Sequence, residues 1–158
     1  MEYPRIIEGD LQARNLKFTI VAARFNESVV ERLVDGAVKA LMSHGAATSQ
    51  VEIVRVPGAF DLPVVVRRIA ETGRADAIIA LGAVIRGETA HFDYIAGECA
   101  SGLSRVSSDT GVPVVFGVLT TDTVEQAEER AGGKEGNRGA DAARAAIYLA
   151  TLLQKFGS

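Results

Sequence analysis

A short, almost continuously apolar run, KFTIVAARF at 17–25, is the first of four similar runs in this sequence. Its apolar residues do not alternate with polar ones, which is typical of a strand buried on both faces in a parallel sheet. A helix-like segment follows each run. This alternation predicts a three-layer, doubly wound α/β sandwich around a four-stranded parallel sheet, with right-handed crossovers. The other three runs are VEIVRV at 51–56, ADAIIALGAVI at 75–85 and VPVVFGVL at 112–119.

The segments between these runs carry the signals of helices. Residues 26–45 place a stripe of valine, leucine and alanine on one helical face, and Ser28 and Glu31 have the spacing of a capping box near its start. Thr123 and Gln126 have the same spacing at the start of a short helix. We therefore expect helices over 26–45, 61–73, 89–111, 123–132 and 139–156.

The composition narrows the class of protein. A length of 158 residues and a hydrophobic share of 47% predict one domain, residues 1–158, with residues 1–15 as an N-terminal arm. A net charge of −3 without a basic stripe argues against nucleic-acid binding. Cys99 is the single cysteine, so neither an intrachain disulfide nor a cysteine-based zinc cluster can form. Without a signal-like N-terminus or an apolar run of about 20 residues, we expect a cytoplasmic protein that does not enter a membrane.

Ligands of open parallel sheets bind outside the carboxyl ends of the strands. Four loops should meet at that edge, and the third of them holds His91, one of two histidines in the sequence. A group that exchanges protons near neutral pH, close to hydroxyls and to the backbone N–H groups of a helix start, suits acid–base chemistry on a small anionic substrate. The four loops are 24–26, 57–61, 86–92 and 116–123.

Each of these residues also has a structural alternative. Taken singly, Phe25, Phe60 and Phe116 are more typical of core residues that close the edge of a sheet. A lone His91 is more typical of a helix cap or of packing against Tyr94. Their grouping on one edge favours a site over these alternatives. Other chemistries have weaker support, because the sequence holds no Walker A motif, no G-x-G-x-x-G after the first strand, no G-x-S-x-G and too few clustered ligands to predict a metal site.

Five longer stretches follow one another along the chain: ARFN, VPGAFDLP, ALGAVIRGETAHFDYI, GVLTTDTVEQAEERAG and GNRGADAA. From about Leu16 to the last helix, the sequence resembles the 6,7-dimethyl-8-ribityllumazine synthases, whose fold is a flavodoxin-like sandwich. The resemblance implies a transferase that condenses 5-amino-6-(D-ribitylamino)uracil with 3,4-dihydroxy-2-butanone 4-phosphate in the penultimate step of riboflavin biosynthesis. The steps are proton transfers, so the resemblance implies no metal and no organic cofactor.

The resemblance also implies roles for individual residues. His91 matches the proposed proton carrier, Phe25 matches the phenylalanine that stacks on the pyrimidine ring, and Phe116 matches the aromatic residue that a neighbouring subunit contributes. Arg138 is a further candidate near the site. The residues implied in binding the pyrimidine and its ribityl chain are Ala59, Phe60, Asp61, Ala83, Val84 and Ile85, and those on the phosphate side are Glu88, Thr89 and Arg130.

Asp61 and Arg138 depart from the family pattern. Glutamate is more frequent at the first position, so the carboxylate of this chain has a shorter reach to the ribityl hydroxyls. Many relatives have lysine at the second position, and arginine keeps the charge but changes the geometry. We expect the side chain of Glu88 to point away from the phosphate turn. Asp93 is a candidate to orient His91, although residues two apart on a helix do not face each other.

The resemblance further implies a homopentamer with sites between adjacent subunits and, in many relatives, a hollow shell of sixty subunits. The arm segment RIIEG then adds a strand to the sheet of a neighbouring subunit. The turn GGKEGNRG lacks the insertion associated with pentamer-only relatives, which favours the sixty-subunit shell, with riboflavin synthase as a candidate guest inside it. Two other functions stay open: a lumazine- or riboflavin-binding protein that has lost the reaction, and a structural shell-forming protein.

Overall fold

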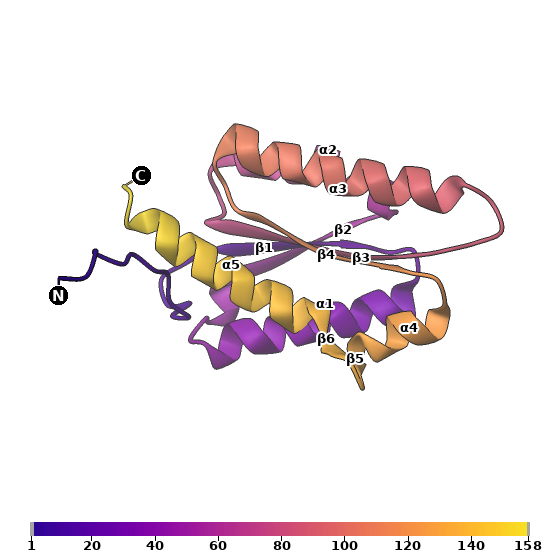
Figure 1. Cartoon of the computed structure of the whole chain (residues 1–158), viewed down its shortest axis with the longest axis horizontal. Helices are drawn as coiled ribbons and strands as arrows, with labels where there is room; N and C mark the ends of the chain where they lie inside the picture. The colour runs from indigo at the N-terminus through magenta and orange to yellow at the C-terminus, as the bar shows by residue number, and fades with distance from the viewer. Residues whose placement is uncertain (1, 158) are drawn as a thin grey trace.

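A computed structural model of the chain describes residues 2–157, in which helices cover both faces of a central sheet (Figure 1). The four strands of that sheet are parallel and lie in the order β2-β1-β3-β4. α2 and α3 cover one face, and α1 and α5 cover the other (Figure 1). The predicted doubly wound α/β sandwich is therefore confirmed. In chain order the elements are β1 Phe18–Ala23, α1 Glu27–Ser43, β2 Val51–Val56, α2 Leu62–Thr72, β3 Ala77–Ile85, α3 His91–Thr110, β4 Val114–Thr121, α4 Val124–Glu129, β5 Ala131–Gly133, β6 Gly136–Asn137 and α5 Arg138–Gln154.

The strands differ in burial according to their place in the sheet. β1 and β3 are central; every residue of β1 is buried, as is β3 as far as Val84. β2 forms one edge, and its Glu52 and Arg55 are exposed. The run that forms β4 is as apolar as the central ones, yet it forms the other edge and leaves Phe116 43% exposed. Apolar continuity therefore indicated a strand but did not distinguish a central strand from an edge strand.

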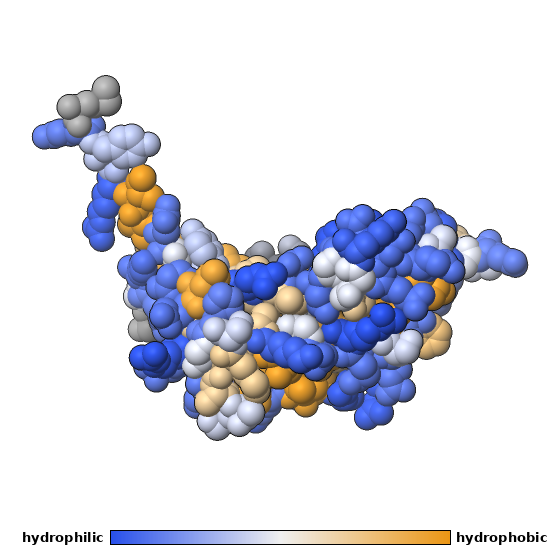
Figure 2. Space-filling view, turned by 90° about the horizontal axis from the view of Figure 1, so that it is seen from below, coloured by the Kyte–Doolittle hydropathy of each residue, from blue (hydrophilic) through white to orange (hydrophobic). Residues whose placement is uncertain are grey.

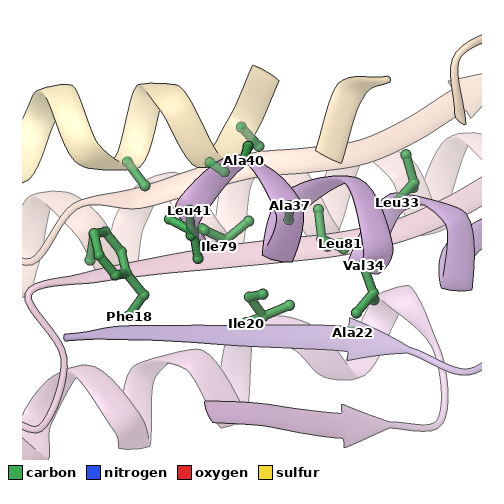
Figure 3. Packing of buried hydrophobic residues seen from close by; sticks show 14 of the residues in the cluster. Phe18, Ile20, Ala22, Leu33, Val34, Ala37, Ala40, Leu41, Ile79 and Leu81 are labelled. Atoms are coloured by element: carbon green, nitrogen blue, oxygen red, sulfur yellow. The ribbon is translucent and has the colours of Figure 1, made fainter. Parts of the chain in front are cut away.

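The sheet buries its two faces in two separate apolar clusters. Because side chains alternate along a strand, Phe18 and Ile20 of β1 point to one face, and Val21 and Ala23 point to the other. Figure 3 shows the first cluster, in which side chains of β1 and β3 pack against the leucine, valine and alanine stripe of α1. Burial of apolar surface, at roughly 25 cal/mol per Å², is what holds both helical layers on the sheet.

The start of α1 differs from the prediction. Asn26 precedes the helix with a φ of 63°, and its side-chain amide donates a hydrogen bond to the carbonyl of Ala83 at 2.8 Å. The capping box predicted at Ser28 and Glu31 is wrong, because the helix already begins before Ser28. The carboxylate of Glu31 pairs instead with Arg55 of β2.

The capping box at the start of α4 is confirmed. Thr123 Oγ1 accepts a hydrogen bond from the backbone N–H of Gln126 at 3.1 Å, and Gln126 Oε1 accepts from the backbone N–H of Thr123 at 3.3 Å. The same Gln126 oxygen accepts from the N–H of Asp122 at 2.8 Å. These bonds fix the corner between β4 and α4. Beyond α4, the predicted polar turn is a small antiparallel hairpin formed by β5 and β6.

The N-terminal arm lies beside the sandwich rather than in it. Residues 2–12 contain no helix or strand, and Tyr3 and Ile6 are 78% and 63% exposed. Figure 2 shows the arm projecting from the body of the molecule, with apolar residues among hydrophilic ones. The base of the arm is held on α5, where the N–H of Asp10 donates to Thr151 Oγ1 at 2.8 Å. The strand that the arm is expected to add to a neighbouring subunit involves a second copy and stays a prediction.

Candidate active site

A cavity of about 290 Å³ opens at the carboxyl ends of β1, β2 and β3. The strand order reverses between β1 and β3, and open parallel sheets bind ligands at such a switch point. Apolar groups dominate the lining, with few polar ones among them, as in most small-molecule sites. The lining includes the predicted residues Phe25, Ala59, Phe60, Ala83, Val84, Ile85, Thr89 and His91.

Two of the aromatic rings that border this cavity, Phe25 and Phe60, were predicted as site residues. Phe25 and Phe60 are 72% and 57% exposed, so the alternative that they close the core does not hold in this chain. Phe25 lies two residues after the end of β1, and its N–H donates to the carbonyl of Pro57 at 3.1 Å. Phe60 lies in a short 3₁₀ turn, Ala59–Asp61. Both rings are therefore open to stacking on a planar ligand.

The end of β3 presents backbone groups to the cavity. Its ladder with β1 stops at Leu81, whereas its ladder with β4 continues to Ile85. The last residues of β3 therefore have a neighbouring strand on one side only, and they line the cavity on the other. The Ala83 carbonyl is already occupied by the amide of Asn26, a lining residue that sequence reasoning missed. An asparagine between a strand and a helix was the available signal, because asparagine tolerates the left-handed backbone region.

His91 is the first residue of α3 and is exposed at the edge of the cavity. It is the one titratable side chain in the lining. The residue in the N-cap position is Ala90, so His91 is not the cap of this helix. Asp93 does not orient the imidazole; its carboxylate lies 3.5 Å from the guanidinium of Arg86, and across residues 2–157 no hydrogen bond joins it to His91. The imidazole therefore faces an open site. The backbone N–H of His91 donates a hydrogen bond to Thr89 Oγ1 at 3.4 Å.

Asp61 and Glu88 are outside the lining. Asp61 Oδ2 accepts a hydrogen bond from the N–H of Gly58 at 3.0 Å, so its carboxylate closes its own loop. A role for Asp61 in holding a ribityl chain therefore requires that it share or exchange this bond. Glu88 is exposed in the turn between β3 and α3, and Gly87 and Thr89 on either side of it reach the cavity.

The remaining predicted residues lie in a second hollow, of about 480 Å³, along β4, α5 and the end of α4. Phe116, Arg130 and Arg138 line this hollow, and none of them lines the first cavity. Arg130 is half-buried; its Nη1 donates to the carbonyl of Gln126 at 3.0 Å and lies 3.8 Å from the carboxylate of Glu129. Within one chain, the predicted site is therefore divided between two hollows.

Cys99 is not a candidate nucleophile. Its side chain is fully buried in α3, and burial raises the pKa of its thiol to about 11. A thiol with that pKa holds little thiolate near neutral pH, and the thiolate is the reactive form. In the part of the chain that the structure describes, no group of three or more His, Cys, Asp or Glu side chains is arranged to hold a metal ion, and no helix is long and apolar enough to cross a membrane.

The fold and this cavity together define a doubly wound α/β protein that binds a small molecule at the carboxyl edge of its sheet. A family model described as 6,7-dimethyl-8-ribityllumazine synthase matches residues 15–154, and the chain belongs to that family. A 6,7-dimethyl-8-ribityllumazine synthase of Desulfatibacillum aliphaticivorans is 51% identical over 153 residues, which cover 97% of this chain and 99% of the relative. One of Nitratidesulfovibrio vulgaris is 52% identical over 155 residues, which cover 98% and 99%. The family expected from the sequence motifs is confirmed.

Proposed function

We propose that this chain is a transferase that makes 6,7-dimethyl-8-ribityllumazine from 5-amino-6-(D-ribitylamino)uracil and 3,4-dihydroxy-2-butanone 4-phosphate, with release of phosphate and water. The observation that carries the proposal is the cavity, whose lining includes eight of the residues that the family motifs imply. Identity of 51% to a synthase of that name, over nearly the full length of both chains, supports it further.

The cavity offers a distinct surface to each part of the substrates. The pyrimidine ring stacks on Phe25, and its polar edge meets the end of β3 beyond the ladder with β1. The phosphate lies at the turn of residues 87–89, where the N-terminus of the long helix α3 favours an anion. Holding both substrates in this way removes much of the entropic barrier to a bimolecular condensation.

The chemical steps need proton transfers at successive atoms. The 5-amino group attacks the ketone carbon, and loss of water gives an imine. Elimination of phosphate leaves an enol, which tautomerises to a ketone; the ribitylamino nitrogen then attacks that carbon, and loss of a second water closes the ring. His91 stands at the cavity edge, where its imidazole acts as the general base and general acid for these transfers.

His91→Ala should lower kcat about 10- to 100-fold and leave turnover well above the spontaneous rate. The expected loss lies at or below the lower end of the usual contribution of a general acid–base group, roughly 100-fold, because the proximity of the two substrates persists. Single-turnover and steady-state rates of lumazine formation measure this effect. A fall to the spontaneous rate would mean that the histidine does more than transfer protons.

The complete site is formed between adjacent subunits of a homopentamer. The division of the predicted residues between two hollows of one chain supports this arrangement, since a second copy can bring its Phe116 and Arg130 to the first cavity. A heterologous contact of this kind generates a closed ring when the rotation between neighbours closes.

Mixing two impaired variants tests whether the site is shared. If one subunit supplies His91 and its neighbour supplies Arg130, co-expressed His91→Ala and Arg130→Ala chains should form rings in which about a quarter of the sites are intact, because subunits mix at random. The mixture should then show about a quarter of the wild-type rate. A rate equal to the mean of the two pure variants would place both residues in the same subunit's site.

The proposal extends to the larger assembly. The arm, with its exposed Tyr3 and Ile6, adds a strand at the open edge of a neighbour's sheet. The short turn between β5 and β6 is compatible with a sixty-subunit shell, with riboflavin synthase as its guest. A solution mass of about 60 rather than about 5 times the monomer would support the shell.

Residues 1–158 act as one domain in the cytoplasm, where a single reduced cysteine is usual.

A second candidate function is a lumazine- or riboflavin-binding protein that no longer catalyses the reaction. The presence of His91 at the cavity and of Arg130 in the second hollow favours the enzyme. The test is to mix the purified protein with both substrates and to follow lumazine fluorescence. A rate no higher than the spontaneous one would reject the enzymatic function. A structural shell protein without catalysis would give the same rate, and it would bind neither lumazine nor riboflavin.

A further inference from the structure

Arg86 joins three elements at the edge of the cavity. Its Nε donates a hydrogen bond to Asp122 Oδ1 at 2.9 Å, and its Nη1 lies 3.5 Å from Asp93 Oδ1. Its Cζ lies 4.4 Å from the centre of the Phe92 ring, and that ring lines the cavity. Its backbone N–H donates to the carbonyl of Thr121 at 2.8 Å. One residue therefore connects the corner between β4 and α4 with the first turn of α3.

The corner between β4 and α4 is held by more contacts than the turn that precedes α3. On one side, the backbone of Asp122 is bound by Gln126 in the capping box, and Thr121 is buried and paired with β3. On the other side, residues 86–90 are all exposed. The guanidinium of Arg86 thus ties the exposed turn before α3 to the fixed corner between β4 and α4.

The value of these contacts lies in geometry rather than in stability. An exposed ion pair contributes no more than about 1 kcal/mol to folding. Arg86 differs from an isolated pair, because its planar fork reaches two carboxylates on different elements and lies over an aromatic ring. The hydrogen bond with Asp122 also raises the pKa of Arg86, so the side chain stays cationic.

We propose that Arg86 is a positioning residue, which holds the turn of residues 87–89 and the start of α3 in the geometry that accepts the substrate's phosphate. The inference rests on the proposed synthase function. Arg86 acts through the turn, since it does not itself line the cavity.

Arg86→Gln tests the proposal through the two Michaelis constants. The KM for the butanone phosphate should rise about tenfold, because a small displacement of a binding turn is costly, while the KM for the pyrimidine should stay within about twofold. The pyrimidine contacts at Phe25 and at the end of β3 do not involve Arg86, so this split separates positioning from a general loss of folding. Asp122→Asn should change the same KM in the same direction, by less.

A double variant and a matched control complete the experiment. Adding Asp122→Asn to Arg86→Gln should raise the KM for the butanone phosphate little further, because the two changes remove the same contact between Arg86 and Asp122. Arg74→Gln breaks another exposed pair, with Glu52 at 2.8 Å at the opposite end of the sheet, and should leave both KM values unchanged. The inference would be overturned if the effects of the two changes on KM were fully additive in the double variant. It would also be overturned if Arg86→Gln left both KM values unchanged or raised both equally.

The outcome for the wild-type protein keeps this inference separate from the proposed function. If the wild-type protein shows no turnover, the proposed function fails, and binding of inorganic phosphate by titration calorimetry then decides the inference. A Kd about tenfold weaker in Arg86→Gln than in the wild-type protein supports positioning of an anion site by Arg86. An equal Kd overturns it.

Discussion

Arg130→Ala is expected to raise the KM for the butanone phosphate about 100-fold and to change the KM for the pyrimidine little. Arg130 is half-buried, and its guanidinium is held by the Gln126 carbonyl in the second hollow, so it is preorganised for an anion. Charge-assisted hydrogen bonds from arginine to a phosphate contribute about 2–3 kcal/mol, and each 1.4 kcal/mol or so is a factor of ten in affinity. Steady-state kinetics with each substrate varied in turn measures the effect.

Arg32→Ala is the control for this experiment. Arg32 also contacts α4, through an ion pair of 3.3 Å with Glu128, but it does not line either hollow. Its removal should leave both KM values near those of the wild-type protein. Equal rises of the two KM values in Arg130→Ala would count against a phosphate-binding role for this arginine.

Gly139→Ala is expected to destabilise the protein by about 3 kcal/mol, at the upper end of the cost of overpacking a core. Gly139 lies in the first turn of α5, where this helix packs on α1. A Cβ placed there would lie 2.0 Å from the backbone oxygen of Leu33 and 2.7 Å from its carbonyl carbon. Backbone atoms cannot move aside as a flexible side chain can, so the two helices must separate.

Gly97→Ala is the matched control, because it makes the same change within α3, where a Cβ meets no atom of residues 2–157 within 4 Å apart from the adjoining residues and backbone of its own helix. There alanine should be neutral or should stabilise by about 0.5–1 kcal/mol through the lower backbone entropy of the unfolded chain. Urea unfolding of all three proteins at one protein concentration gives the comparison, since assembly makes stability depend on concentration. A midpoint for Gly139→Ala equal to that of the wild-type protein would contradict the predicted clash.

The layers of the fold could be predicted from local pattern. Four apolar runs and the helical periodicity between them correspond to the four strands of the sheet and to the helices that cover it, with bounds that differ by a few residues. The capping box at Thr123 was predicted correctly, whereas the one at Ser28 was not. A capping box needs its serine at the residue before the first helical turn, and Asn26, tied to Ala83 across the sheet, takes that place.

The candidate site was predicted in part. The loops that follow β1, β2 and β3 do meet, because parallel strands bring their carboxyl ends to one edge. The rule does not tell which way each loop faces, and Arg130 lines a second hollow beyond β4, together with Phe116, which the resemblance assigned to a neighbouring subunit's site. Asn26 and Arg86 lie in the predicted loops 24–26 and 86–92 but were not singled out, since their contacts join residues that are far apart in the sequence.

By itself, the sequence determined the α/β class, the position of each strand of the parallel sheet, the family and the residue types that gather at the active edge. These properties follow from local periodicity and from motifs, which need no knowledge of neighbours in space. Only the tertiary structure decided that β4 is an edge strand, that the predicted residues divide between two hollows, and that Arg86 connects the phosphate turn to the corner held by Gln126. Those outcomes depend on strand order and on contacts between distant segments, and long-range packing selects them among many arrangements with the same local pattern.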